Sequence, residues 1–273
     1  LTLTATPIPR TLAISLYGDM VVSTIKTMPR GRKPVLTEVI KSHSMKPILN
    51  KLKNYLASGG QCYVVCPLVD ESDVIDSRDA TSIYEGMKAY FKNHYTVGLL
   101  HGKMDDETKE KTMDDFKANR IQILVSTTVI EVGVDVSNAN WIVIYNAERF
   151  GLSQLHQLRG RVGRGHEQGY CYLLSNSSSK EAIERLEFLK NCHDGFEVSY
   201  YDLKIRGPGE ILGNQQSGLP AFAIGDIFKD INILEVTRKD AQELLESKSN
   251  DVAYLKLINE IEEQLINNNK YID

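Results

Sequence analysis

The 273-residue chain has only four cysteines, and they do not form a metal-binding pattern. Cys62 and Cys66 are the two that lie close together, in a run that is typical of a β-strand. At ~3.3 Å per strand residue, their Cα atoms would lie roughly 13 Å apart, which is too far for a disulfide bond. A zinc site would need closely spaced pairs of Cys or His, a pattern that the sequence does not show. We therefore expect no disulfide, no metal site and a reducing, cytoplasmic setting.

Long apolar runs are also missing. The stretch 11–22 comes nearest to one, but it contains Gly18 and Asp19 and is too short to cross a bilayer. No signal peptide is visible, because the chain opens at Leu1 without a basic segment followed by an apolar one. We expect a chain that starts inside a longer protein and has no membrane partner.

The chain also has no overall basic charge. It contains 32 Lys and Arg residues and 36 Asp and Glu residues, which gives a net charge of −4. Taken alone, this balance weighs against nucleic-acid binding, which usually needs a basic face. The distribution is uneven, however: basic residues gather at 30–33 and 159–164, and much of the acid follows Asp226. A local groove for phosphate groups is therefore compatible with the sequence.

From Val35 to Leu174, short β-rich runs alternate with amphipathic stretches, which is typical of a parallel sheet covered by helices. The predicted strands are 36–40, 62–66, 96–100, 121–125, 141–145 and 170–174. Helices are expected at 48–56, where Gly59 and Gly60 end the helix, around 83–91, and from an N-cap at Asp105 through Met113 and Phe116. This pattern predicts an α/β fold.

The residues on either side of this segment are predicted to form other elements. Residues 2–22 are typical of the last strand and turn of a different unit, joined by a linker that contains Pro29, Gly31 and Pro34. After a polar run at 175–180 we expect a helix near 181–191, a glycine-rich loop at 206–220 and two more helices. The last helix has one apolar stripe, formed by Tyr254, Ile258, Ile261 and Leu265.

The most informative stretch is residues 157–165, Gln-Leu-Arg-Gly-Arg-Val-Gly-Arg-Gly. Arg159, Arg161 and Arg164 recur among glycines, which suits a helix end that presents guanidinium groups to phosphate oxygens. A solvated basic face is the alternative, since runs of charge usually lie on the surface.

This stretch resembles motif VI of superfamily 2 helicases, whose pattern Gln-x-x-Gly-Arg-x-x-Arg matches Gln157, Gly160, Arg161 and Arg164. The resemblance implies that Arg161 and Arg164 are arginine fingers on the phosphates of ATP, in a cleft between two RecA-like domains. It also implies nucleotide contacts for Gln157 and Gly160. Fingers of this kind accelerate phosphoryl transfer by ~10³- to 10⁵-fold, so we predict Arg161 and Arg164 as the catalytic residues.

Other stretches resemble motifs of the same family and occur in its expected order: 3–10 motif III, 62–67 motif IV and 126–135 motif V. The resemblance implies coupling roles for Thr4 and Thr6, nucleotide contacts for Gly133 and Asp135, and DNA contacts for His101, Gly102, Lys103, Thr127 and Thr128. Each stretch has an ordinary alternative, such as a helix cap for the threonines or a turn for His101 and Asp135. Their joint order favours the helicase interpretation.

Within superfamily 2, residues 6–13, 29–34 and 147–157 are similar to RecG-type helicases. Residues 202–218 resemble the translocation motif shared by the RecG and Mfd types, a helical hairpin whose loop reaches toward duplex DNA. DNA contacts are thereby implied for Arg206 and Gln216, although Gln215 stands where many members carry Arg. An Mfd-like transcription-repair coupling translocase is one alternative. A non-catalytic RecA-like module that binds DNA or a protein is another.

The resemblance implies a RecA-like parallel sheet flanked by helices, with a C-terminal hairpin and loop extension. Residues 1–30 would end a first motor domain and its linker, 31–176 would form the second RecA-like domain, and 177–273 the hairpin, loop and helices. The implied function is that of the C-terminal motor portion of an ATP-dependent DNA helicase that regresses replication forks and migrates Holliday junctions. Branched duplex DNA and single-stranded DNA-binding protein are the implied partners, and we expect a monomer.

Two ATPase motifs are not found in the sequence. There is no Gly-x-x-x-x-Gly-Lys-Ser/Thr loop to hold phosphates, and no Asp-Glu box follows a predicted strand. We therefore expect this chain alone to be inactive, with ATP and Mg²⁺ bound mainly by a motor domain upstream.

Overall fold

The structure is a computed structural model that describes residues 23, 25, 31, 33–42, 44–67, 76–127, 136–164, 167–206, 230–247 and 252–269. The described residues fall into two compact units, one up to Arg206 and one from Asp230 on. The second unit contains helices α9 (Ile231–Ser247) and α10 (Val252–Asn269), which are the two helices expected near the C-terminus. The domain boundaries at 30 and 176 stay predictions.

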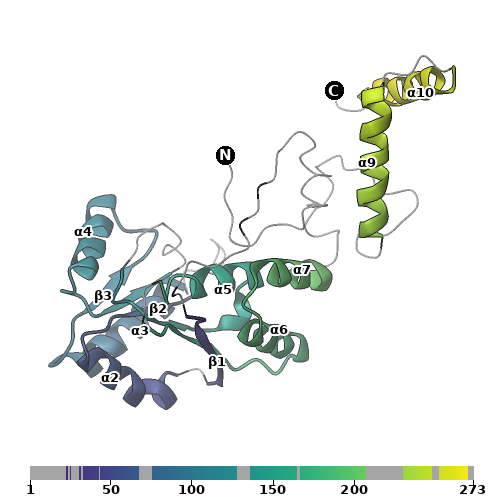
Figure 1. The fold of residues 1–273 in the computed structure, drawn as a ribbon. Helices are drawn as coiled ribbons and strands as arrows, with labels where there is room; N and C mark the ends of the chain where they lie inside the picture. Colours follow the sequence, from purple (N-terminus) through teal and green to yellow (C-terminus); the bar gives the residue numbers. More distant parts are fainter. Residues whose placement is uncertain are drawn as a thin grey trace. The chain divides into compact units, whose positions relative to one another are not determined.

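Within the described residues, the first unit is built on one parallel sheet of six strands, in the order β1-β6-β5-β2-β4-β3 (Figure 1). The bounds are β1 Leu36–Lys41, β2 Cys62–Val65, β3 Val97–Leu100, β4 Ile123–Ser126, β5 Trp141–Ile144 and β6 Tyr170–Ser175. All six predicted strands are found, and the predicted α/β fold is confirmed. The central strands β2, β4 and β5 are buried along their whole length, as expected for strands that are covered on both faces.

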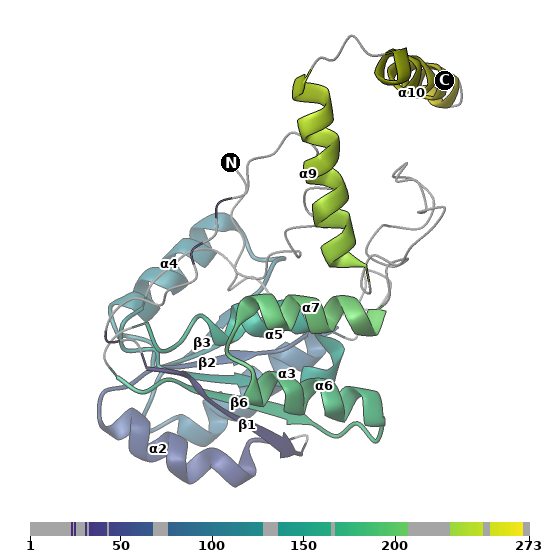
Figure 2. The same ribbon diagram turned by 45° about the vertical axis from the view of Figure 1, so that its right-hand side comes forward.

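Helices cover both faces of this sheet (Figures 1 and 2). One face packs against α2 (Leu49–Ala57) and α3 (Asp76–Phe91). The other face packs against α4 (Asp106–Lys117), α5 (Leu152–Arg159) and α6 (Lys180–Asn191). Helix α7 (Gly195–Arg206), which we did not predict, lies against α5 and stacks Tyr201 on Phe188 with ring centroids 3.8 Å apart. The sheet is thus the middle layer of the unit.

The predicted helix ends at Asp105 and Gly59 are confirmed. The Asp105 carboxylate accepts hydrogen bonds from the amide and the hydroxyl of Thr108, both at 2.8 Å, and these bonds lower the pKa of Asp105. Gly59 has φ +89°, a left-handed conformation that glycine adopts without the strain of a side chain. Phe116, at the other end of α4, is fully buried.

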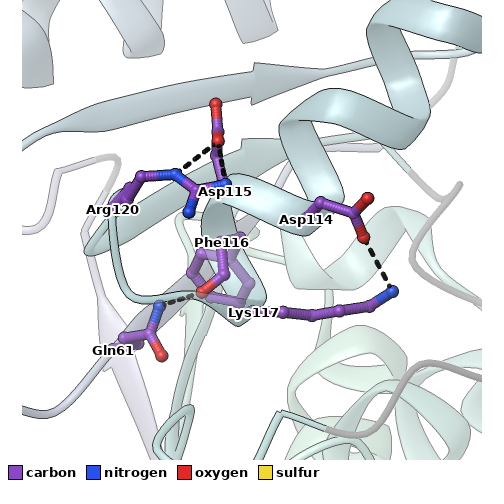
Figure 3. Close-up of polar contacts among 6 residues, drawn as sticks. All are labelled: Gln61, Asp114, Asp115, Phe116, Lys117 and Arg120. Carbon is purple, nitrogen blue, oxygen red and sulfur yellow. Dashed lines mark hydrogen bonds and ion pairs between the residues drawn. The ribbon is translucent and has the colours of Figure 1, made fainter.

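The turn between α4 and β4 is tied to the sheet by Gln61, which immediately precedes β2 (Figure 3). Gln61 is fully buried, and its Nε2 donates to the carbonyl oxygens of Phe116 at 2.6 Å and Ile121 at 2.7 Å. The same figure shows Arg120 folded onto Asp115 at the surface, with a shortest N–O distance of 2.6 Å. The turn therefore has one buried amide contact and one exposed ion pair.

We predict that Gln61→Met lowers the free energy of unfolding by ~1–3 kcal/mol, because two buried carbonyl groups lose a donor. The matched variant Arg120→Met removes only the exposed ion pair and should cost ~1 kcal/mol or less. Urea unfolding followed by fluorescence reports on this unit, because the one tryptophan, Trp141, is buried in the sheet. Equal losses for the two variants would contradict the role given to Gln61.

Candidate functional site

Helix α5 carries the arginine-rich stretch from one edge of the sheet to the other. It follows β5 and a short 3₁₀ helix, η3 (Ala147–Arg149), and must run back across the sheet because β5 and β6 are parallel. The Gly151 amide donates to Oε1 of Gln154 at 3.1 Å, which satisfies one donor at the start of the helix. The face of α5 that packs on the sheet is formed by its buried leucines, Leu152, Leu155 and Leu158.

The loop that follows α5, residues 160–164, is anchored at its centre. Its Val162 side chain is fully buried, and the Gly163 amide donates to Oδ1 of Asn140 at 3.2 Å. Gly163 has φ +68°, and a Cβ there would lie 3.0 Å from a methyl carbon of Val35. Glycine is therefore required at this position for both conformation and space.

This loop lies at the edge of the sheet where the strands begin. Val35 and Gly169 pack against Gly163, and Asn140 accepts a hydrogen bond from its amide. They immediately precede β1, β6 and β5, respectively. Gly160, Arg161 and Arg164 therefore belong to the amino-terminal edge of the sheet, and Gln157 lies on the last turn of α5, half-buried.

The three arginines of the stretch have different environments. Arg164 is exposed, with its Nε donating to the Gly160 carbonyl at 3.3 Å, and Arg161 is half-buried. Arg159 is only 4% exposed and donates to the Leu189 carbonyl at 2.5 Å, and burial lowers its pKa. The prediction that Arg159 is presented to phosphate is thus wrong, because its side chain crosses to α6. Arg161 and Arg164 lie on either side of the anchored pair Val162 and Gly163.

His156 lies one turn before the loop and is half-buried near Arg159. Its pKa is lowered to about 4, mainly by desolvation and secondly by the charge of Arg159. An interaction with the backbone of His193 raises the pKa, but by less. The pKa of His193 is lowered too, again mainly by desolvation. Both shifts favour the neutral imidazole, where α5 meets the turn between α6 and α7.

A second group of predicted residues lies at the opposite edge, where the strands end. His101 follows β3 and Thr127 follows the neighbouring strand β4, and the Thr127 amide donates to the Leu100 carbonyl at 3.2 Å. Gly102 and Lys103 are exposed in the turn after His101. Thr127 Oγ1 and His101 Nδ1 are buried without a hydrogen-bond partner among the described residues. Such groups suit a ligand, because a buried polar group without a partner costs free energy.

The described residues thus separate the predicted site into an amino-edge group and a carboxyl-edge group. Several other predicted positions, Thr4, Thr6, Thr128, Gly133, Asp135 and Gln216, as well as the segment 2–22, lie outside the described residues. Arg206 is the last residue of α7, and its side chain is not among those described. All of these assignments stay predictions.

Each of the four cysteines is free and buried. Burial raises the pKa of Cys62, and it raises that of Cys171 to about 12. In the described ranges, no group of three or more His, Cys, Asp or Glu could hold a metal ion. No helix in the part of the chain that the structure describes is long and apolar enough to cross a membrane.

Comparison with known proteins identifies the class and then the family. Residues 47–166, which include strands β2 to β5 and the arginine loop, match the helicase conserved C-terminal domain. Residues 192–269 match the C-terminal part of domain 3 of the ATP-dependent DNA helicase RecG. The chain belongs to the RecG-type helicases of superfamily 2.

The similarity to individual RecG proteins extends over most of the chain. The chain is 48% identical over 245 residues to the ATP-dependent DNA helicase RecG of Bacillus subtilis (strain 168), covering 90% of this chain and 36% of that protein. It is 47% identical over 246 residues to RecG of Staphylococcus aureus (strain NCTC 8325), with the same coverage. A solved structure of RecG bound to a three-way DNA junction matches 85% of this chain and 30% of that chain, with 44% identity and a TM-score of 0.67. The chain therefore spans about a third of the length of its curated relatives.

We predict different effects of two arginine substitutions on stability. Arg159→Ala should lower the free energy of unfolding by ~2 kcal/mol or more, because it removes a buried side chain and the donor to Leu189. Arg164→Ala removes the same charge from an exposed position and should change stability by ~0.5 kcal/mol or less. Urea unfolding midpoints test this, and a small effect for both variants would contradict the buried role of Arg159.

The depressed pKa of His156 predicts a loss of stability in mild acid. Because the folded pKa, about 4, lies below the ordinary value of 6.5, the unfolded chain binds the proton first as the pH falls. The contribution of His156 is therefore complete above about pH 6.5 and is lost as the pH falls toward 4. His156→Gln should reduce the difference in unfolding midpoint between pH 7 and pH 5. A variant with the same difference as the wild-type chain would contradict this assignment.

Proposed function

We propose that the chain is the C-terminal motor portion of an ATP-dependent DNA helicase that remodels branched DNA, through replication fork regression and Holliday junction migration. The observation that carries this proposal is the arrangement of Arg161 and Arg164 around an anchored turn, at the sheet edge opposite His101 and Thr127. The RecG relatives, one of them bound to a three-way junction, support the same function.

Arg161 and Arg164 would act on the nucleotide. Arginine guanidinium groups match the charge and geometry of phosphate oxygens. Arg161 and Arg164 flank a main-chain amide that is already held by a hydrogen bond without any ligand. ATP would supply the phosphoryl group that is transferred to water. The two arginines suit its phosphates but not Mg²⁺, so we assign the cation to a first motor domain. Gln157, Gly160, Gly133 and Asp135 would complete the nucleotide contacts from this side.

The carboxyl edge would hold DNA. The Thr127 hydroxyl and the His101 ring nitrogen are buried polar groups without a hydrogen-bond partner among the described residues, and Lys103 is exposed in the turn after His101. Contacts of this kind position a protein on the DNA backbone without reading sequence. Gly102, Thr128, Arg206 and Gln216 would add to the same surface, and Thr4 and Thr6 would couple it to the nucleotide. Branched duplex DNA and single-stranded DNA-binding protein are the proposed partners of a cytoplasmic monomer.

ATP hydrolysis by the complete gene product, stimulated by forked DNA, tests both edges. Arg164→Ala should lower kcat by ~10³-fold or more, because it removes charge stabilisation from the transferring phosphoryl group, and should leave DNA binding intact. Lys103→Ala should instead weaken DNA binding, so that more DNA is needed for half-maximal stimulation, with kcat at saturating DNA preserved.

The isolated chain provides a further sample, and we expect no hydrolysis from it. A normal kcat for Arg164→Ala would show that this arginine is a surface or DNA-binding residue and would overturn the finger assignment. A complete gene product that binds forked DNA without hydrolysing ATP would favour the non-catalytic binding module.

A further inference from the structure

We propose that Asn140 is a positioning residue for the arginine loop, acting on Arg161 and Arg164 through the main chain between them. The inference rests on the proposed function, because it gives the arginines a task that depends on their position. Asn140 lies 23 residues before Gly163 in the sequence, immediately before β5, and carries no motif of its own.

Every hydrogen-bonding group of Asn140 is engaged. Its main-chain amide donates to Oη of Tyr55 at 3.1 Å, and its carbonyl accepts from the Tyr170 amide at 2.8 Å. In the side chain, Oδ1 accepts from the Gly163 amide at 3.2 Å, while Nδ2 donates to the Ser137 carbonyl and to a carboxylate oxygen of Glu167, both at 3.1 Å. With only 2% of its surface exposed, the side chain has one arrangement that satisfies all of these partners.

The bond to Gly163 bears directly on the arginines. Gly163 immediately precedes Arg164 and lies two residues after Arg161. Its position therefore restricts the positions of the Cα atoms of both arginines. Glycine is the residue with the greatest backbone freedom, and a hydrogen bond to its amide removes part of that freedom. The side-chain amide of Asn140 also donates to Glu167, which follows Arg164 in the sequence, so it contacts the chain both before and after Arg164. A displacement of ~1 Å in a catalytic group can cost ~10²-fold in rate, so this anchoring has consequences for turnover.

Asn140 is itself held from the other face of the sheet by Tyr55 of α2. The Tyr55 hydroxyl donates to the Asn138 carbonyl at 2.7 Å while it accepts from the Asn140 amide. Its ring stacks on Trp141 with centroids 5.4 Å apart, and Gly60 packs so closely on the ring that no Cβ would fit there. Burial raises the pKa of Tyr55 to about 12, so the phenol keeps the proton that it donates. Tyr55, Asn140 and Gly163 thus form one connected path to the loop.

The test measures kcat and KM for ATP in the complete gene product with saturating forked DNA. Asn140→Ala should lower kcat by ~10- to 100-fold and change KM less than ~3-fold, because misplaced fingers lose mainly transition-state contacts. Gln122→Ala is the matched control: Gln122 immediately precedes β4, and its side chain makes its hydrogen bonds to the Thr96 amide and to Asn119 instead of to the arginine loop. It should keep the wild-type kcat.

Two further variants separate positioning from general support of the fold. In the Arg164→Ala background, Asn140→Ala should add less than ~3-fold to the loss, since a residue that acts through the arginine has little left to position. Tyr55→Phe keeps the stacked ring and removes only the hydroxyl, and it should reproduce the kcat effect in weaker form. This variant also decides the matter if Asn140→Ala does not fold.

The outcomes distinguish this inference from the function on which it rests. If Arg164→Ala abolishes turnover while Asn140→Ala and Tyr55→Phe match Gln122→Ala, the positioning role is wrong and the proposed function stands. If the losses from Asn140→Ala and Arg164→Ala multiply, Asn140 acts independently of the arginine and the inference is also wrong. A wild-type protein without DNA-stimulated hydrolysis, or an Arg164→Ala variant with normal turnover, overturns both.

Discussion

The parallel direction of all the strands in the described sheet is the constraint on which the rest of the site depends. A parallel connection must cross the full length of the sheet before the next strand can begin, so residues that end strands and residues that end crossover helices lie at opposite edges. His101 and Thr127 belong to the first kind, and Arg161 and Arg164 belong to the second. The separation of the two predicted groups thus follows from strand direction, and the side chains then decide what each edge can bind.

Much of the fold could be predicted because its strands are buried on both faces. Continuous apolar runs such as 141–145 indicate a central strand of a parallel sheet whatever packs on it, and these runs located the strands to within one or two residues. Helix α7 was missed, because its residues face α5 and α6 instead of the sheet and show no clear apolar stripe in sequence. Its position depends on the packing of another helix, which a local pattern does not report.

The wrong prediction for Arg159 has a physical explanation in the helix itself. Arg159 comes four residues after Leu155, so both side chains lie on the same face of α5, and that face is buried. Its place in the sequence groups Arg159 with Arg161 and Arg164, although the helical period of the leucines places it in the interior. Asn140 is different, since its contact to Gly163 depends on how β5 and the loop after α5 meet in space. No local pattern in the sequence indicates such a contact, and only the structure reveals it.

The arginine loop is therefore connected to the rest of the domain on two sides. Before the loop, Arg159 joins the end of α5 to the last turn of α6 through the Leu189 carbonyl. At its centre, Asn140 joins the loop to β5 and, through Tyr55, to α2 on the opposite face. Buried hydrogen bonds of this kind are costly to break. If the loop moves, its neighbours are therefore expected to move with it, with these hydrogen bonds kept. The main chain that carries the two arginines is thus fixed to the rest of the domain, and their proposed approach to a nucleotide would require the domain to move with them.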